Sequence, residues 1–206
     1  MTEFPLYALS GYNKVLGVFK KLFVAGKAMG INMNYGEIKK NDIANGEGVR
    51  TSLFVSGCRH HCKNCFNSQT WDFDFGMTFD DDTINEILDS CEPSWVNGLS
   101  LLGGEPFEPE NQRELLPFIK KFKEKYPNKD IWCYSGFTFE EITGKKDSRA
   151  HTEISTEMLS LIDILVDGKF VEELKDISLK FRGSSNQRII DVKKSLEQND
   201  IVLYLK

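Results

Sequence analysis

The sequence predicts an α/β fold, in which a parallel sheet is covered by helices. Short apolar runs alternate with amphipathic segments whose apolar residues recur at helical spacing. Three of the apolar runs end at a turn that contains glycine, which is a boundary signal for a strand. The chain has 206 residues, of which 40% are hydrophobic and 28% are charged, so it can bury a sizeable core.

The predicted elements follow one another as strand and helix. Strands are expected in the short apolar runs at residues 52–55, 99–102, 131–134 and 164–166. Helices are expected where apolar residues recur at helical spacing, at residues 83–91, 113–125, 139–142 and 155–162. Strands that are joined through a helix pair in parallel by right-handed crossovers, so these four strands should form one sheet.

The first 32 residues differ in charge from the rest of the chain. They carry a net charge of +3, which leaves −8 for residues 33–206. Apolar residues recur there at helical spacing with lysines between them, at Val15, Leu16, Phe19, Leu22 and Phe23. This pattern could contact a membrane surface or a partner. The preferred interpretation is an N-terminal extension of unknown role, or a start site upstream of Met33, before one domain over residues 33–206.

Composition argues against two classes of function. The net charge of −5 and the pI near 5.3 give no basic footprint for nucleic acid. The longest charge-free stretch in the N-terminal region has ten residues, from 4 to 13, whereas a spanning helix needs about 20.

The cysteines indicate the compartment. The chain has five of them, an odd number, and no secretory signal pattern precedes them. We therefore expect a reducing compartment, the cytoplasm, and a metal site.

Three of the five cysteines fall within eight residues. Cys58, Cys62 and Cys65 have the spacing C-x3-C-x2-C, close enough for one loop to turn three thiols toward a common centre. Iron–sulfur clusters are held by cysteine thiolates, and a 4Fe-4S cluster normally takes four. Three thiolates would leave one iron without a protein ligand, and a metal needs such an open position to bind a substrate. The spacing therefore indicates a catalytic cluster.

Zinc is the alternative occupant, with His60 or His61 as the fourth ligand of a closed site. Closed zinc sites usually take ligands from two separated segments, whereas this group is one tight loop with no second C-x-x-C downstream. Cys91 and Cys133 could complete either site. Because Cys91 ends an amphipathic segment and Cys133 lies within an apolar one, we expect both in the core.

The most unusual local sequences all follow predicted strands. They are the cysteine group, the Gly-Gly-Glu-Pro turn at residues 103–106 and the Asp-Gly-Lys turn at residues 167–169. In α/β folds, ligands bind at the carboxyl ends of the strands. The three segments should therefore share one edge of the sheet.

The cysteine spacing and the Gly-Gly-Glu-Pro turn together resemble the radical S-adenosylmethionine superfamily. Within it, the chain from Met33 onward is similar to the anaerobic ribonucleoside-triphosphate reductase-activating proteins, which activate a glycyl-radical enzyme. The stretches that carry the similarity are GEGVR at 46–50, LFVSG at 53–57, CRHHC at 58–62, CFN at 65–67, Trp71, GGEP at 103–106, DIW at 130–132, LVDGKF at 165–170 and RGSSNQ at 182–187. Many superfamily members have an aromatic residue just before the third cysteine, where this chain has Asn64.

The resemblance implies an open, partial (β/α) barrel and a 4Fe-4S cluster held by Cys58, Cys62 and Cys65. The amino and carboxylate groups of S-adenosylmethionine would chelate the iron left open. An electron from the cluster would then cleave a carbon–sulfur bond to give methionine and a 5′-deoxyadenosyl radical. No side chain is expected to act as a general acid or base.

The resemblance also implies which residues bind S-adenosylmethionine. The turn that would hold the amino group comprises Gly103, Gly104, Glu105 and Pro106. Its glycines would let the backbone approach the ligand, and its carboxylate would accept hydrogen bonds from the ammonium group. Contacts with the adenine would come from Asn64, Cys65 and Phe66. The alternative for Phe66 is packing under the loop.

Three further side chains are candidates for the site. His60 could ligate the metal, donate a hydrogen bond to a cluster sulfide or face solvent. Arg50 and Arg182 could bind the cofactor carboxylate or a partner, and the alternative for each is a surface ion pair.

A protein substrate is expected, because a short chain can close a pocket around a reactive radical only in part. The resemblance implies that the substrate is the anaerobic ribonucleoside-triphosphate reductase, on which a glycine loses an α-hydrogen, with an electron donor such as flavodoxin or ferredoxin. Activation of another glycyl-radical enzyme such as formate lyase is one alternative. A structural zinc-binding interaction module is the other.

Overall fold

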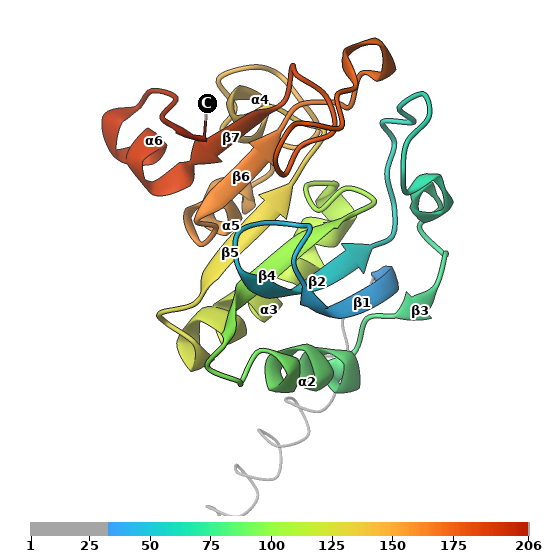
Figure 1. The fold of residues 1–206 in the computed structure, drawn as a ribbon, viewed down its shortest axis with the longest axis vertical. Helices are drawn as coiled ribbons and strands as arrows, with labels where there is room; N and C mark the ends of the chain where they lie inside the picture. Colours follow the sequence, from blue (N-terminus) through green and yellow to red (C-terminus); the bar gives the residue numbers. More distant parts are fainter. Residues whose placement is uncertain (1–32, 206) are drawn as a thin grey trace, which may run out of the picture. The chain divides into compact units, whose positions relative to one another are not determined.

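A computed structural model describes residues 33–205 and contains an eight-stranded mixed sheet (Figure 1). The strands are β1 (Asn34–Asp42), β2 (Val49–Val55), β3 (Met77–Thr78), β4 (Val96–Gly103), β5 (Asp130–Tyr134), β6 (Ile164–Asp167), β7 (Arg188–Asp191) and β8 (Leu203–Leu205). Their order across the sheet is β3-β1-β2-β4-β5-β6-β7-β8. Within the described residues the sheet is open, with β3 and β8 at its edges. The expectations for residues 1–32 lie outside the described residues.

Residues 33–205 also contain five α-helices and two 3₁₀ turns. They are α2 (Asp81–Ser90), α3 (Pro109–Lys125), α4 (Phe139–Ile142), α5 (Ser155–Ser160), α6 (Val192–Gln198), η1 (Ser68–Trp71) and η2 (Glu172–Leu174). The side chain of Asp80 accepts a hydrogen bond from the backbone N–H of Thr83 and so caps α2. None of these helices is long and apolar enough to cross a membrane.

The four strands expected from sequence form the parallel centre of the sheet. β2 pairs in parallel with β4, β4 with β5, and β5 with β6, which confirms the predicted pairing. The sheet as a whole is mixed, because four strands that were not predicted add to it: β1 and β3 on one side and β7 and β8 on the other, all antiparallel. β1 carries mainly polar side chains, and β7 and β8 are short, so none gives a clear apolar run.

Helix boundaries differ from expectation at three places. α2 spans Asp81–Ser90 and not 83–91, because the Asp80 cap starts it two residues earlier. α3 begins at Pro109, four residues earlier than predicted, because proline at the first helical position has a fixed φ and loses no hydrogen bond there. The segment 155–162 ends its helix at Ser160, and Leu161 follows as the C-cap. The helix at Phe139–Ile142 has the predicted limits and begins with a capping box formed by Thr138 and Glu141.

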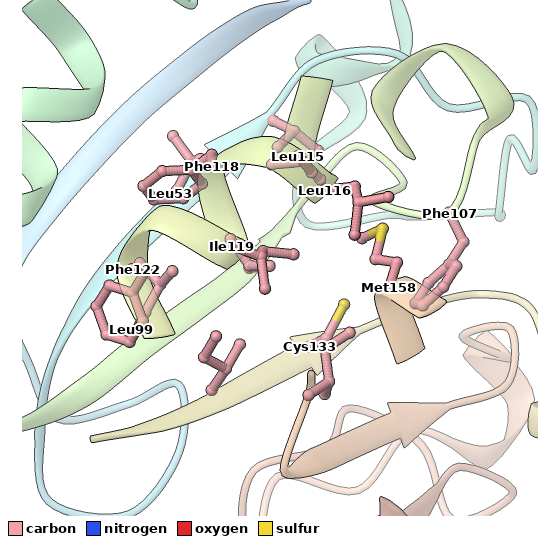
Figure 2. Close-up of a cluster of buried hydrophobic side chains, with 14 of the residues drawn as sticks. Leu53, Leu99, Phe107, Leu115, Leu116, Phe118, Ile119, Phe122, Cys133 and Met158 are labelled. Carbon is pink, nitrogen blue, oxygen red and sulfur yellow. The ribbon is translucent and has the colours of Figure 1, made fainter. Parts of the chain in front are cut away.

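One face of the sheet carries the main apolar core (Figure 2). Alternate residues of the parallel strands, Leu53, Leu99 and Cys133 among them, are fully buried there and face α3. α3 contributes the buried side chains Leu115, Leu116, Phe118, Ile119 and Phe122. Cys91 and Cys133 are both completely buried in this core, as predicted.

The other face of the sheet carries rows of side chains set by the strand register. Phe54 pairs with Leu102, and Tyr134 pairs with Val166, at the carboxyl ends of the strands. The loop of residues 43–48, which we call the floor loop, covers the side chains that lie farther from this edge. Ser100 Oγ holds the loop there by donating to the carbonyl oxygen of Asn45. The side chains next to the carboxyl edge therefore remain free to line a cavity.

Candidate functional site

A cavity of about 470 Å³ opens at the carboxyl ends of the parallel strands. Its lining brings together the cysteine loop (residues 56–67), the turn after β4 and the rim loop (residues 168–187, between β6 and β7). Figure 1 shows the cysteine loop and the rim loop extending beyond the same edge of the sheet. The prediction that the three unusual segments share one edge is confirmed. The volume lies within the usual range of about 300–1,000 Å³ for small-molecule sites.

All three predicted cluster ligands line this cavity as free thiols. Cys58 is buried, whereas Cys62 and Cys65 are half-buried. Among residues 33–205, no three His, Cys, Asp or Glu side chains are grouped tightly enough to hold a single metal ion. A 4Fe-4S cluster makes a different demand, because its ligands bind separate iron atoms at different corners. The three thiols line one cavity, which is where the ligands of such a cluster would lie.

Backbone N–H groups donate hydrogen bonds to two of these thiols, Cys58 and Cys62. Burial, reinforced by the Glu105 carboxylate, raises the pKa of the Cys58 thiol to about 12, and hydrogen bonds from the N–H groups of His60 and His61 oppose that rise. Burial also raises the pKa of Cys62, whereas the Lys169 ammonium and the hydrogen bond from the Phe170 N–H lower it. Donors aimed at sulfur stabilise a thiolate and tune the potential of a cluster that it holds.

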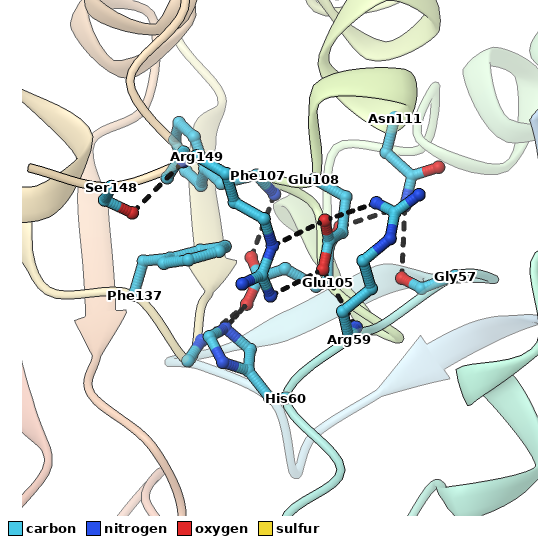
Figure 3. Close-up of polar contacts among 12 residues, drawn as sticks. Gly57, Arg59, His60, Glu105, Phe107, Glu108, Asn111, Phe137, Ser148 and Arg149 are labelled. Carbon is cyan, nitrogen blue, oxygen red and sulfur yellow. Dashed lines mark hydrogen bonds and ion pairs between the residues drawn. The ribbon is translucent and has the colours of Figure 1, made fainter.

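Glu105 connects three segments of the site (Figure 3). Its buried carboxylate accepts from the Phe107 N–H at 2.9 Å and Ser135 Oγ at 2.8 Å through one oxygen. The other oxygen accepts from the Gly136 N–H at 2.7 Å and meets His60 Nε2 at 3.1 Å. A carboxylate has about four acceptor positions, and here the protein uses all of them. Glu105 therefore fixes the cysteine loop against the ends of β4 and β5.

The two glycines of the turn are required by the backbone itself. Gly103 has a φ of +104°, and a Cβ there would lie 2.7 Å from the backbone of Phe54. A Cβ on Gly104 would lie 2.6 Å from the carbonyl oxygen of Gly57. The reason given from sequence, close approach to a ligand, is thus not the one that the contacts show. Gly104 nevertheless lines the cavity, and its carbonyl oxygen accepts no hydrogen bond from residues 33–205.

A second buried carboxylate, Glu108, holds the cysteine loop through Arg59 and was not foreseen from sequence (Figure 3). It accepts from the N–H of Arg59 at 2.8 Å and from its guanidinium at 2.7 Å. Arg149 binds the same carboxylate through two nitrogens, at 3.0 and 2.9 Å. Burial alone would raise the pKa of Glu108, but these hydrogen bonds lower it. The sequence gives only one sign of this ion pair, which is that Arg59 directly follows Cys58 and that Glu108 lies close to the Gly-Gly-Glu-Pro turn.

His60 lies inside the site. Its side chain is only 4% exposed, so the expectation that it could face solvent is wrong. The ring packs on Phe137 with centroids 4.3 Å apart and contacts Glu105 through Nε2. Because a carboxylate only accepts hydrogen bonds, Nε2 carries the proton. The other ring nitrogen, Nδ1, is buried and has no hydrogen-bond partner in the described part of the chain.

Two more buried polar atoms beside the cavity lack partners. The indole N–H of Trp71 and the hydroxyl of Tyr134 bond to nothing in residues 33–205, and both residues line the cavity together with His60. Burial raises the pKa of Tyr134 above its usual range, so the hydroxyl stays protonated. Buried polar groups are nearly always paired, so these atoms fit contacts with a bound polar molecule. The donor set thus fits a cofactor with polar groups next to a cluster.

The predicted adenine contacts occupy different environments. Phe66 lines the cavity mouth but is 66% exposed, so the alternative that it packs under the loop is wrong. Its ring lies 5.5 Å from that of Phe170. Asn64 has a φ of +54° and an exposed side chain, and it does not line the cavity. Pro106 is buried and also lies outside the lining.

The two candidate arginines lie in different places, one outside the cavity and one in its lining. Arg50 is completely buried, donates to Ser100 Oγ and the Leu99 carbonyl oxygen at 2.8 Å each, and does not line the cavity. Arg50 does form an ion pair, with the partly exposed Asp130, but its own guanidinium is buried and not at the surface as expected, because the strand register carries it beneath the floor loop. Arg182 lines the cavity and donates to the Gln187 carbonyl oxygen at 2.8 Å.

Comparison with known proteins decides the family. A family model described as a 4Fe-4S single cluster domain matches residues 44–190. The anaerobic ribonucleoside-triphosphate reductase-activating protein of Haemophilus influenzae is 43% identical over 159 residues, which cover 76% of this chain and 97% of that protein. This chain belongs to the anaerobic ribonucleoside-triphosphate reductase-activating protein family. The predicted resemblance is confirmed.

Further members of the reductase-activating family show the same similarity. The Escherichia coli K12 protein is 40% identical over 157 residues, covering 75% of this chain and 96% of its own. The Enterobacteria phage T4 protein is 38% identical over 157 residues, covering 76% and 93%. The matched 4Fe-4S region contains Cys58, Cys62 and Cys65, which favours iron and sulfide over zinc at the cysteine loop.

Proposed function

We propose that this protein activates an anaerobic ribonucleoside-triphosphate reductase by reductive cleavage of S-adenosylmethionine at a 4Fe-4S cluster, which leaves a glycyl radical on the reductase. The relatives' names supply the activity and the partner. The observation that carries the mechanism is one cavity lined by three free cysteines and a Gly-Gly-Glu turn.

Cys58, Cys62 and Cys65 would hold the cluster and leave one iron open. When bound, the cluster and S-adenosylmethionine would supply the electron and the carbon–sulfur cleavage that lead to hydrogen abstraction. The protein's own part is to keep the cysteine loop in place. The buried carboxylates Glu105 and Glu108 do so from the turn after β4, since each accepts hydrogen bonds from a neighbour of Cys58.

The turn at Gly103, Gly104, Glu105 and Pro106 would bind the amino group of S-adenosylmethionine. Because the carboxylate of Glu105 is saturated by protein donors, we assign the ammonium contact to the free carbonyl oxygen of Gly104. The unpaired groups of His60, Trp71 and Tyr134 would take further polar atoms of the cofactor. Cys65 and Phe66 would flank the adenine at the mouth, and Asn64, which lies outside the lining, would contribute only through the backbone of the same loop.

The fold supports the same proposal. Four parallel strands carry the site at their carboxyl ends, as the centre of an open, partial (β/α) barrel of the radical S-adenosylmethionine type would. We assign this domain to residues 33–206, since β1 begins at Asn34, and treat residues 1–32 as an extension. The reductase would close the open side, a donor such as flavodoxin or ferredoxin would reduce the cluster, and the free thiols suit the cytoplasm.

The test is anaerobic reconstitution with iron and sulfide, followed by reduction and assay of 5′-deoxyadenosine from S-adenosylmethionine. We expect iron, acid-labile sulfide and product from the wild type and a large loss of all three from Cys62→Ala. Cys91→Ala is the matched control, because that buried thiol lies away from the cavity and its removal should leave cluster and product intact. Stoichiometric zinc without sulfide, or a loaded cluster that yields no product, would contradict the proposal.

A further inference from the structure

Large hydrophobic side chains are exposed beside the cavity mouth. Ile177 is 95% exposed, the highest value among the large hydrophobic residues of the described chain, and Leu174 is 43% exposed. Both belong to the rim loop, whose other residues Phe170, Phe181 and Gly183 line the cavity itself. Across the mouth, Phe66 of the cysteine loop is 66% exposed. Contiguous exposed apolar side chains mark surfaces that bind other molecules.

The base of the rim loop is firmly held. The amide oxygen of Gln187 accepts from the N–H groups of Gly183 and Ser184, and its Nε2 donates to the Gly168 carbonyl oxygen at 3.0 Å. Asn186 donates to the carbonyl oxygen of Lys169 at 2.8 Å. The conspicuous Arg-Gly-Ser-Ser-Asn-Gln sequence is therefore an internal brace that fixes the two ends of the loop. A braced loop can present a surface at little entropic cost.

Contacts across the mouth join the rim loop to the cysteine loop. The ring centroids of Phe66 and Phe170 lie 5.5 Å apart. The Lys175 ammonium lies 5.1 Å from the centroid of the Phe66 ring. Lys63 pairs with Glu173 at 3.2 Å. Phe66 and Phe170 thus lie together at the edge of the cavity, and the exposed Leu174 directly precedes Lys175, which reaches the Phe66 ring.

The tip of the rim loop turns back onto its base, since Leu179 lines the cavity and the N–H of Asp176 donates to the carbonyl oxygen of Gly183 at 3.3 Å. At residues 176–180, the side chain of Asp176 accepts from the N–H and the hydroxyl of Ser178, which is a local turn. Ile177 sits in this turn with its side chain in solvent. The fold gains no apolar burial from Ile177, so its side chain is available to a partner.

We infer that Phe66, Leu174 and Ile177 form the docking surface for the protein substrate, a surface of the reductase that combines apolar side chains with acidic ones. This inference rests on the proposed function, because a glycine that enters the cavity must bring its protein past this rim. The rim loop has four basic and three acidic residues, a net charge of +1 in a chain whose net charge is −5. Complementarity therefore favours an acidic partner surface.

The experiment uses the full-length, reconstituted protein with Leu174→Ser and Ile177→Ser combined. Glycyl-radical formation is measured by EPR against the concentration of the reductase. We expect the concentration giving half the maximal rate to rise roughly tenfold or more, since central apolar contacts dominate interfaces. The maximal rate, and 5′-deoxyadenosine formation without the reductase, should stay unchanged.

Trp95→Ser is the matched control. Its side chain is also 66% exposed, but it precedes β4 at the amino end of that strand, whereas the cavity lies at the carboxyl end. The half-maximal concentration should stay at the wild-type value. An unchanged value for the Leu174 and Ile177 double variant would overturn the docking surface and leave the proposed function standing, provided that the radical still forms. A change of oligomeric state in light scattering, with no change in reductase dependence, would assign the surface to a second copy of the chain and also overturn it.

Discussion

The two faces of the sheet differ in what their side chains contact, as alternate residues of β5 show. Ile131 and Cys133 are fully buried in the core beneath α3. Trp132 and Tyr134 point to the opposite face, where Trp132 packs beside Arg50 and the hydroxyl of Tyr134 lacks a partner. One face carries the main apolar core. The other carries a smaller apolar cluster around Trp132 and Val166 and, beside the cavity, polar atoms that have no partner in the described residues. The alternation along each strand thus separates the side chains of the main core from those that can line the cavity.

The largest effect on stability should come from the helix-covered face. Phe122→Ala removes a fully buried ring between α3 and the sheet and leaves a cavity behind. We expect a loss of about 3–5 kcal/mol in the free energy of unfolding, measured by urea denaturation of the protein without its cluster. Cys65→Ser, on the cavity face, should change that free energy by less than about 1 kcal/mol. Similar losses for both variants would remove the distinction between the faces.

An intermediate effect, dependent on pH, should come from Asp42, the last residue of β1, whose carboxylate holds the start of the floor loop. Asp42 accepts hydrogen bonds from Ala44, Asn45 and Ser52. Although burial would raise the pKa of this carboxyl, these bonds and one from Lys39 lower it from 3.8 to about 2. A lowered folded pKa means that the stabilisation is complete above the unfolded value and is lost as the pH falls through about 2.

Asp42→Asn tests this directly. At pH 6 we expect a loss of about 2 kcal/mol in the free energy of unfolding, the energy that corresponds to the pKa shift. The difference from wild type should shrink between about pH 4 and pH 2, as the wild-type carboxyl takes up its proton. A difference that stays constant over this range would mean that the charge of Asp42 contributes nothing.

The smallest effect on stability should have the opposite sign. Tyr134→Phe removes a buried hydroxyl that has no partner in the described residues. We expect a gain of about 1 kcal/mol in the free energy of unfolding, because the desolvation cost of that hydroxyl disappears. The same change should raise the KM for S-adenosylmethionine in the 5′-deoxyadenosine assay. A loss of stability with unchanged KM would show that Tyr134 belongs to the core and not to the site.

Sequence reasoning found the elements whose signal is local. The parallel strands are short apolar runs, and the cysteine loop and the glycine turn lie close to the ends of β2 and β4. Edge strands escaped it, because β1 alternates a few apolar residues with many polar ones and β8 has only three residues. The edge of the sheet shared by the three motifs followed from the general rule for parallel strands.

The second layer of the site could not be predicted, because it depends on long-range pairs. Glu108 meets Arg149, 41 residues away, and Glu105 meets Ser135 and Gly136, about 30 residues away. These pairs form only once β4, β5 and the loop before α5 are in place. The burial of Arg50 has the same origin, since its partner Ser100 lies on the neighbouring strand.

The most direct test of the central claim is the count of glycyl radicals on the reductase. The reconstituted protein, S-adenosylmethionine, a reductant and the reductase are incubated without oxygen, and the radical is quantified by EPR. The account predicts a radical with the wild type and with Cys91→Ala, and none with Cys62→Ala. A radical of equal yield from Cys62→Ala, or none from a wild-type protein with a full cluster, would contradict it.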